Sequence, residues 1–146
     1  MKNVHITLVG KEALPVFYPI YEYRPDISYL IGTRQSKPVM DNLCATIEKY
    51  GLQCVEEIIG DAFDANICKR KCDSIIANEG LDCSYTFNLT GGTKPMALGA
   101  MWSAIMHDCA MIYTDSKDCI DIRTSKKTPL QQHLSPELIF MLQGQK

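Results

Sequence analysis

The chain has 146 residues, 46% of them hydrophobic, and a formal net charge of −2. This length suits one domain with its own core, and the hydrophobic content argues against disorder. The slight negative charge argues against a protein that coats long nucleic acid, although a few local cations could still hold a small anion. No apolar run approaches the length of a membrane span, so we expect no membrane partner.

The start of the chain and its seven cysteines bear on the compartment. Met1 to Asn3 lead directly into a short alternating segment, which we interpret as a strand and not as a secretory signal. The odd number of cysteines fits reduced thiols, and we therefore expect a cytoplasmic protein. Cys68 and Cys72 could share one face of a helix, but no second Cys or His pair at zinc spacing accompanies them, so we expect no metal site.

Strand and helix signals alternate from the start of the chain almost to its end. We predict strands at residues 4–10, 27–31, 54–59, 83–89, 109–113 and 119–123. Helices are predicted between the first five strands, at residues 13–23, 36–50, 64–78 and 93–107. Ser36 and Asp64 are interpreted as N-caps, with Pro15 and Pro38 inside first helical turns. A short last helix is expected from Ser135.

Repeated strand–helix–strand units with short loops predict a parallel sheet with right-handed crossovers. The tight turn at residues 115–118 requires the last two strands to be antiparallel. The predicted fold is therefore α/β: a Rossmann-like, doubly wound sheet ordered 3-2-1-4-5-6, with strand 6 reversed and a short C-terminal helix. We assign a ligand-binding domain to residues 1–128. Residues 126–129 are interpreted as a linker, and residues 129–146 as a segment that leads to a missing domain or docks as a tail.

In an open parallel sheet, ligands bind beyond the carboxyl ends of the strands, where the strand order reverses. Here that point lies between strands 1 and 4. Gly10 and Lys11 follow strand 1, residues 33–37 follow strand 2, and residues 90–94 follow strand 4. Four cations are therefore expected at one edge of a chain that is acidic overall: Lys11, Arg34, Lys37 and Lys94.

The loop after strand 4 carries the strongest chemical signal. Gly91 and Gly92 would let the backbone turn and approach a ligand without a Cβ penalty. Thr93 and Lys94 open the next helix, whose N-terminal N–H groups favour an anion. With Asn88 and Thr90 beside them, these residues predict a phosphate or nucleotide site.

Several familiar patterns are missing. No GxGxxG follows strand 1, so we expect no dinucleotide and no other cofactor, and no GxxxxGK[ST] marks a P-loop NTPase. His5, His107 and His133 lie far apart, with no nucleophile pattern near them, and are interpreted as structural.

At this point the sequence resembles a known family. The segment Asn88-Leu89-Thr90-Gly91-Gly92-Thr93-Lys94-Pro95-Met96 resembles the loop after strand 4 in CRISPR-associated Rossmann-fold (CARF) domains. The similar branch is the one N-terminal in nucleases of type III CRISPR systems that cyclic oligoadenylates activate. Residues 33–36 are similar to that branch's loop after strand 2, and residues 134–138 resemble the start of its segment toward the effector domain.

The resemblance implies a homodimer that binds a cyclic oligoadenylate, most often the four-membered ring, across its two-fold axis and then switches on an attached effector. The chain departs from that pattern because it contains no nuclease, HEPN or deaminase domain. Together, the residues and the resemblance give the candidate ligand-binding set: Gly10, Lys11, Thr33, Arg34, Gln35, Ser36, Asn88, Thr90, Gly91, Gly92, Thr93 and Lys94.

Two alternatives stay open. A standalone ring nuclease would cleave the same ligand without a metal, by in-line attack of a 2′-OH on the adjacent phosphate. Lys94 and a hydroxyl of Thr93, Thr90 or Ser36 are the candidates for that chemistry. The other alternative is a small nucleotide-binding Rossmann protein of other metabolism.

Overall fold

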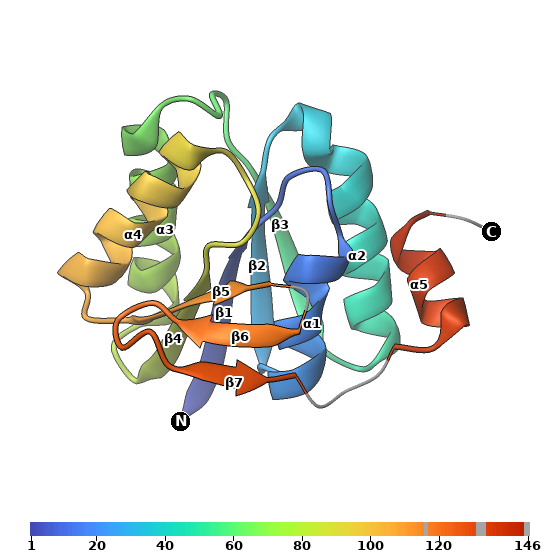
Figure 1. Cartoon of the computed structure of the whole chain (residues 1–146). Helices are drawn as coiled ribbons and strands as arrows, with labels where there is room; N and C mark the ends of the chain where they lie inside the picture. The colour runs from blue at the N-terminus through green and yellow to red at the C-terminus, as the bar shows by residue number, and fades with distance from the viewer. Residues whose placement is uncertain (116, 131–133, 145–146) are drawn as a thin grey trace.

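The computed structural model describes residues 1–115, 117–130 and 134–144, so Ser116 and His133 lie outside the described residues. A single sheet of seven strands runs through the molecule in the order β3-β2-β1-β4-β5-β6-β7 (Figure 1). The strands are β1 Lys2–Leu8, β2 Ile27–Gly32, β3 Gln53–Ile58, β4 Cys83–Asn88, β5 Ala110–Thr114, β6 Asp118–Asp121 and β7 Lys127–Pro129. The helices are α1 Leu14–Tyr23, α2 Lys37–Lys49, α3 Ala65–Glu79, α4 Lys94–Met106 and α5 Pro136–Leu142, with a 3-10 turn at Arg34–Ser36 before α2.

The predicted α/β Rossmann-like fold is confirmed. The strands β3, β2, β1, β4 and β5 are parallel to one another, and β6 is antiparallel to β5. The order 3-2-1-4-5-6 and the short C-terminal helix are as expected. The switch point therefore lies between β1 and β4, where the sequence placed it.

The interpretation of residues 126–129 as a linker is wrong, because Lys127–Pro129 form β7, antiparallel to β6. Asp121 turns the chain there, since its Oδ1 accepts hydrogen bonds from the N–H groups of Arg123 and Thr124, at 2.9 and 3.3 Å. Pro129 ends the strand and can lie in it because an edge strand leaves one row of backbone groups unpaired.

The two faces of the sheet are covered differently. The helices α3 and α4 pack on one face over apolar side chains such as Ile6 and Phe87, while α1 and α2 cover the other face (Figure 1). The α1 and α2 face holds a buried polar set that includes His5, Thr7 and Asn88. The helix α5 packs against α2 with Leu138 and Leu142 buried. Among the described residues, no helix combines the length and apolarity needed to cross a bilayer.

Local capping explains where two helices begin. Asp64 caps α3 as predicted, because its side chain accepts hydrogen bonds from the N–H groups of Asn66 and Ile67. Ser36 occupies the N-cap position of α2 as predicted, but its side chain accepts no hydrogen bond from the first turn of the helix. Its hydroxyl bonds the backbone N–H and C=O of Thr33, and Pro38 at the start of α2 offers no N–H to cap.

The cysteines are unpaired, in agreement with free thiols. Cys68 and Cys72 both lie on α3, where their side chains are fully buried in the core that α3 shares with α4. Among the described residues, no three His, Cys, Asp or Glu side chains converge at distances that would hold a metal ion.

His5 gives the fold a pH dependence. It is buried in β1 between Ser28 and Thr86 of the flanking strands, and burial lowers its pKa from 6.5 to about 4. The unfolded chain therefore binds a proton between pH 6.5 and 4 that the folded chain does not. We expect this residue alone to lower the free energy of unfolding by up to about 3 kcal/mol as the pH falls across that interval.

The measurement is urea unfolding of the wild type and of a His5→Gln variant at several values between pH 7 and 4. The variant has no titrating imidazole, so its stability should fall less steeply over this interval. Equal slopes for the two proteins would show that His5 does not titrate differently in the folded state.

Candidate functional site

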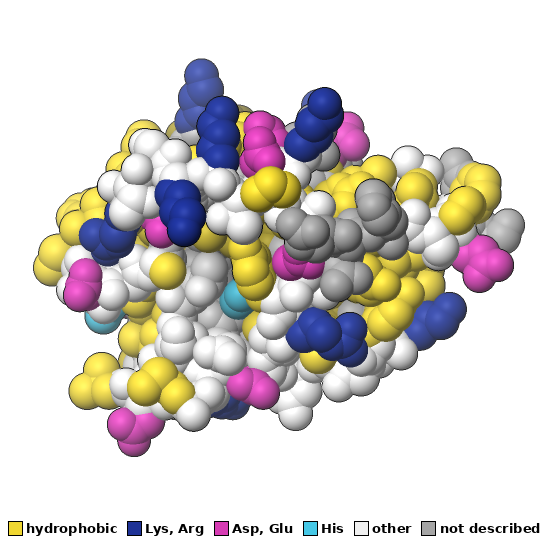
Figure 2. All heavy atoms as spheres, turned by 60° about the horizontal axis from the view of Figure 1, so that its bottom comes forward, with side chains coloured by type: hydrophobic (Ala, Val, Ile, Leu, Met, Phe, Trp, Pro, Cys, Tyr) yellow, Lys and Arg dark blue, Asp and Glu magenta, His cyan; other side chains and the backbone are white. Residues whose placement is uncertain are grey.

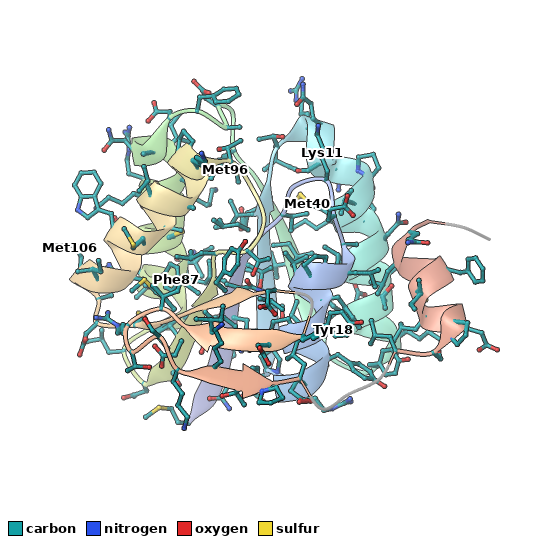
Figure 3. All side chains as sticks on the ribbon, viewed as in Figure 1. Lys11, Tyr18, Met40, Phe87, Met96 and Met106 are labelled. Atoms are coloured by element: carbon teal, nitrogen blue, oxygen red, sulfur yellow. The ribbon has the colours of Figure 1, made fainter. Side chains whose placement is uncertain are left out.

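A cavity of about 840 Å³ lies at the carboxyl edge of the parallel strands. Its wall comes from every loop at that edge: β1–α1, β2–α2, β3–α3, β4–α4 and β5–β6. In Figure 3, Lys11 of the β1–α1 loop and Met96 of α4 lie on the two sides of this edge. The first turns of α1, α2, α3 and α4 face the same edge, so their N–H groups give it a positive potential.

The β4–α4 loop packs backbone to backbone against the end of β1. A Cβ on Gly91 would lie 2.4 Å from the carbonyl oxygen of Leu8, and one on Gly10 would lie 3.0 Å from the backbone nitrogen of Gly92. Gly92 itself has a left-handed φ of 77°. We interpreted the glycine pair as room for a ligand, but contact with β1 already requires Gly91, and the left-handed φ already favours glycine at position 92.

A hydrogen-bond chain holds Thr90 in place. Asn88 is fully buried under the loop, and its Oδ1 accepts hydrogen bonds from the backbone N–H and the hydroxyl of Thr90. The hydroxyl of Thr90 in turn accepts one from the backbone N–H of Thr114 at 2.9 Å, which ties β4 to the end of β5. Asn88 therefore shapes the loop from below and does not line the cavity.

The other two candidate hydroxyls are also engaged. Thr93 donates to the carbonyl of Ala62 and accepts from the N–H of Met96, which caps α4 and joins its start to the β3–α3 loop. Ser36 is buried, with its hydroxyl on Thr33. In the wild-type arrangement each of the hydroxyls considered for catalysis thus has a structural partner.

The cations at the edge differ in their availability. Lys11, Arg34 and Lys94 are exposed, and within the described part of the chain no ion pair or hydrogen bond engages their side chains. Lys37 is not available in the same way, because its Nζ lies 2.8 Å from Asp41 and 3.0 Å from Glu56. Figure 2 shows Lys and Arg side chains projecting along the upper edge of the molecule.

Most of the predicted set comes together in the structure. The cavity is lined by Gly10, Lys11, Thr33, Gln35, Ser36, Thr90, Gly91, Gly92 and Thr93. The cations Arg34 and Lys94 lie next to lining residues in the chain but are not among those lining the cavity, and Asn88 lies beneath it.

Comparison with known proteins assigns the chain to a family. A family model described as "HFX_2341_N:-like, N-terminal" matches residues 3–118. The chain belongs to this family. No curated protein sequence matches it.

Solved structures share its fold. Can2 from Sulfobacillus thermosulfidooxidans, in complex with cyclic tetra-adenylate, superposes with a TM-score of 0.87 at 22% identity over 97% of this chain and 41% of its own. A type III CRISPR defence DNA nuclease activated by cyclic oligoadenylate has a TM-score of 0.82 at 17% identity, over 97% of this chain and 23% of its own. Enterococcus italicus Csm6, bound to cyclic hexa-2′-fluoro-hexa-dAMP, has a TM-score of 0.67 at 14% identity, over 99% of this chain and 38% of its own.

These likenesses confirm the resemblance to CRISPR-associated Rossmann-fold domains, and at such identities they concern the fold alone. The chain spans less than half the length of each of these three proteins.

The apolar residues of the cavity lining were not predicted from the sequence. Phe63 and Ala62 of the β3–α3 loop, Tyr113 of β5 and Val39 of α2 all line it. The predicted topology did indicate where such residues could lie, because the loops after strands 3 and 5 reach the same edge of the sheet as those after strands 1 and 4.

The contact between Gly91 and Leu8 predicts a stability effect. A Gly91→Ala variant puts a methyl group into a backbone carbonyl that cannot turn away, and we expect a loss of about 1–3 kcal/mol. Gly60→Ala is the matched control, because a Cβ there meets nothing within 4 Å. Thermal unfolding of both variants is the measurement, and a Gly91→Ala protein as stable as the control would contradict the close packing described above.

Proposed function

We propose that the chain is a sensor domain that binds a cyclic oligoadenylate, with cyclic tetra-adenylate as the preferred ring. The observation that carries the proposal is the cavity of about 840 Å³ at the switch point, bordered by cations that have no ionic partner among the described residues. Its fold is shared with Can2, solved with cyclic tetra-adenylate, and with a nuclease activated by cyclic oligoadenylate.

The phosphates of such a ring would lie toward the polar side of the cavity. Lys11 lines it, Lys94 and Arg34 flank it, and the N–H groups of the first turn of α4 point to the same side. A charge-assisted hydrogen bond and a helix N-terminus are both favourable for phosphate. A net charge of −2 is compatible with this arrangement, since only the local field at the edge acts on the ligand.

We further propose that two copies share the ligand. The helix α4 starts with Lys94 and exposes a stripe of large apolar side chains, Leu98, Trp102, Ile105 and Met106. No charged residue interrupts the segment from Pro95 to Met106. The ammonium group of Lys69 in α3 lies 5.0 Å from the centre of the Trp102 ring, and its charge is paired with Asp73. Self-association through this stripe would bury apolar area and would bring both β4–α4 loops near one two-fold axis.

The domain would act on an effector, as the resemblance implies. The chain covers only 41% of Can2 and 23% of the defence nuclease, so both proteins contain a further part to which this fold is attached. We keep the division into a ligand-binding domain at residues 1–128 and a C-terminal segment at 129–146. A cytoplasmic location remains part of this proposal.

The ring-nuclease alternative is less well supported. In-line cleavage would use the substrate's own 2′-OH, with protein groups that orient it and stabilise charge. The hydroxyls of Thr90, Thr93 and Ser36 already hold the loops together. Lys94 would remain as a charge for the transition state. We therefore favour binding over turnover.

The proposal is tested by calorimetry of the purified chain with cyclic tri-, tetra- and hexa-adenylate, and with NAD as the probe for the other nucleotide-binding alternative. Chromatography of the same samples without metal reports any linear product. Tight binding of a cyclic oligoadenylate without NAD binding supports a sensor. Binding of NAD alone would overturn the proposal, and rapid release of linear products would favour the nuclease.

Replacing Lys94 should damage binding more than folding. A charge-assisted hydrogen bond to phosphate is worth about 1.5–3 kcal/mol, which is roughly ten- to a hundredfold in Kd for Lys94→Ala. Stability should stay within about ±0.5 kcal/mol, since the side chain is exposed and unpaired. Lys126→Ala, in the exposed turn between β6 and β7, is the control and should bind normally. If Lys94→Ala binds as tightly as the wild type, Lys11 or Arg34 takes its place as the phosphate ligand.

A charge in the middle of the α4 stripe should separate the two copies. In Ile105→Glu, two carboxylates would approach each other in an apolar interface, and we expect a monomer by light scattering at micromolar protein where the wild type is a dimer. Phe140→Glu carries the same charge on a similarly accessible side chain of α5, which packs against α2 on the other face of the sheet, so it should stay dimeric. A wild type that is monomeric with and without ligand would end this part of the proposal.

A further inference from the structure

Phe63 stands out among the cavity residues because its side chain is 77% exposed. Because singly exposed apolar side chains are common on protein surfaces, the position of Phe63 at the cavity matters more than its exposure. Unlike the apolar stripe on α4, Phe63 is a single aromatic side chain at the mouth of a cavity. The question is therefore what the ring would contact in the liganded protein.

The backbone that carries Phe63 is held in place from both sides. The N–H of Phe63 donates to Oδ1 of Asp61 at 2.8 Å, and Asp64 caps α3 directly after it. Directly before it, the carbonyl of Ala62 accepts the hydroxyl of Thr93 at the start of α4. The loop is thus anchored to both α3 and the β4–α4 loop, and the ring is presented to the cavity with little backbone freedom to lose on binding.

The helix pair under the loop is also tightly packed. A Cβ on Gly99 of α4 would lie 2.1 Å from the carbonyl oxygen of Ala65 in the first turn of α3. This close approach fixes the start of α3, and with it Phe63, relative to the β4–α4 loop that offers Lys94. The distance between the aromatic ring and the phosphate-binding side is therefore set by the fold.

The cavity consequently combines two kinds of surface. Cations and helix N-termini border it, while Phe63, Val39, Met96 and the half-exposed Tyr113 give its lining an apolar part. A nucleotide has the same division, with charged phosphates at one end and a flat aromatic base at the other. Stacking on an exposed ring is available to any base, because every base has a π-face.

We propose that Phe63 is a base-stacking platform that covers one adenine of the ligand. This inference rests on the proposed function and deepens it by assigning the base contact to the β3–α3 loop. Phe63 then contributes affinity and orientation, and it does not itself choose adenine over another purine.

The test compares Phe63→Ala, Phe63→Leu and Phe63→Trp by calorimetry with cyclic tetra-adenylate. Loss of a stacking contact should weaken binding roughly 5- to 150-fold per site in the alanine variant. Leucine keeps an apolar side chain without a π-face and should remain weakened, whereas tryptophan should bind at least as tightly as phenylalanine. Leu81→Ala, which removes a 92% exposed side chain before β4, should bind and melt like the wild type.

A second readout separates stacking from charge. Because phosphate contacts release counterions, the binding constant falls with salt in proportion to the phosphates neutralised. Phe63→Ala should therefore weaken binding equally at low and high salt, while Lys94→Ala should flatten the salt dependence. Light scattering should give Phe63→Ala the same oligomeric state as the wild type.

The outcomes distinguish the two claims. If the wild type binds the ring and Phe63→Ala binds as tightly, the platform is overturned while the proposed function stands. If Phe63→Leu binds as tightly as the wild type, the contact is apolar burial without stacking. If Phe63→Ala changes the oligomeric state, Phe63 belongs to a contact between subunits. Either result overturns the stacking proposal. A wild type that binds no cyclic oligoadenylate overturns the proposed function and the platform with it.

Discussion

The contact between the backbone of Gly91 and the carbonyl of Leu8 is the constraint on which the site depends. Without a side chain at this position, the β4–α4 loop can lie directly on the end of β1. Hydrogen bonds then connect this loop to its surroundings: Thr90 bonds Asn88 and Thr114, and Thr93 bonds Ala62. Loops that follow four different strands thus behave as one surface.

The helix layers on the two faces of the sheet differ in how polar their buried contacts are. On the α3 and α4 side, apolar packing and the Gly99 contact join two helices closely. On the α1 and α2 side, buried His5, Thr7 and Ser28 break the apolar surface of the sheet, and the side-chain amide of Asn88 reaches the carbonyl of Val16 in α1. The β4–α4 loop contacts both layers, since it leaves the sheet at Asn88 and enters α4 at Lys94.

Much of the fold could be predicted because its strands and helices repeat a simple pattern. The antiparallel last pair followed from a turn too short for a crossover. By contrast, β7 has only three residues and no alternation, and it forms because β6 offers a free edge. Ser36 stands at the predicted N-cap position of α2, but its hydroxyl bonds the backbone of Thr33 in the preceding turn, which the residue pattern does not show.

The polar side of the site was equally predictable, because glycines, hydroxyls and cations are visible after each strand. The apolar side was not, since Phe63 and Tyr113 look like ordinary core residues until the loops are placed. Lys37 shows the opposite error: it reads as a free cation, but Asp41 lies one turn further along α2 and Glu56 lies on the neighbouring strand. Spacing alone cannot show which charges neutralise one another across a fold.

The strand β7 has a consequence for how copies of the chain meet in solution. An open sheet edge invites strands from other molecules, which is a route to aggregation. Here one edge is three residues long, carries Lys127 and ends in Pro129, which has no N–H to offer. At the other edge, β3 carries Glu56 and Glu57, whose charges are held by Lys37 and Lys71. Neither end of the sheet is a good template for further strands, so intermolecular β-pairing is disfavoured even at high concentrations of the protein.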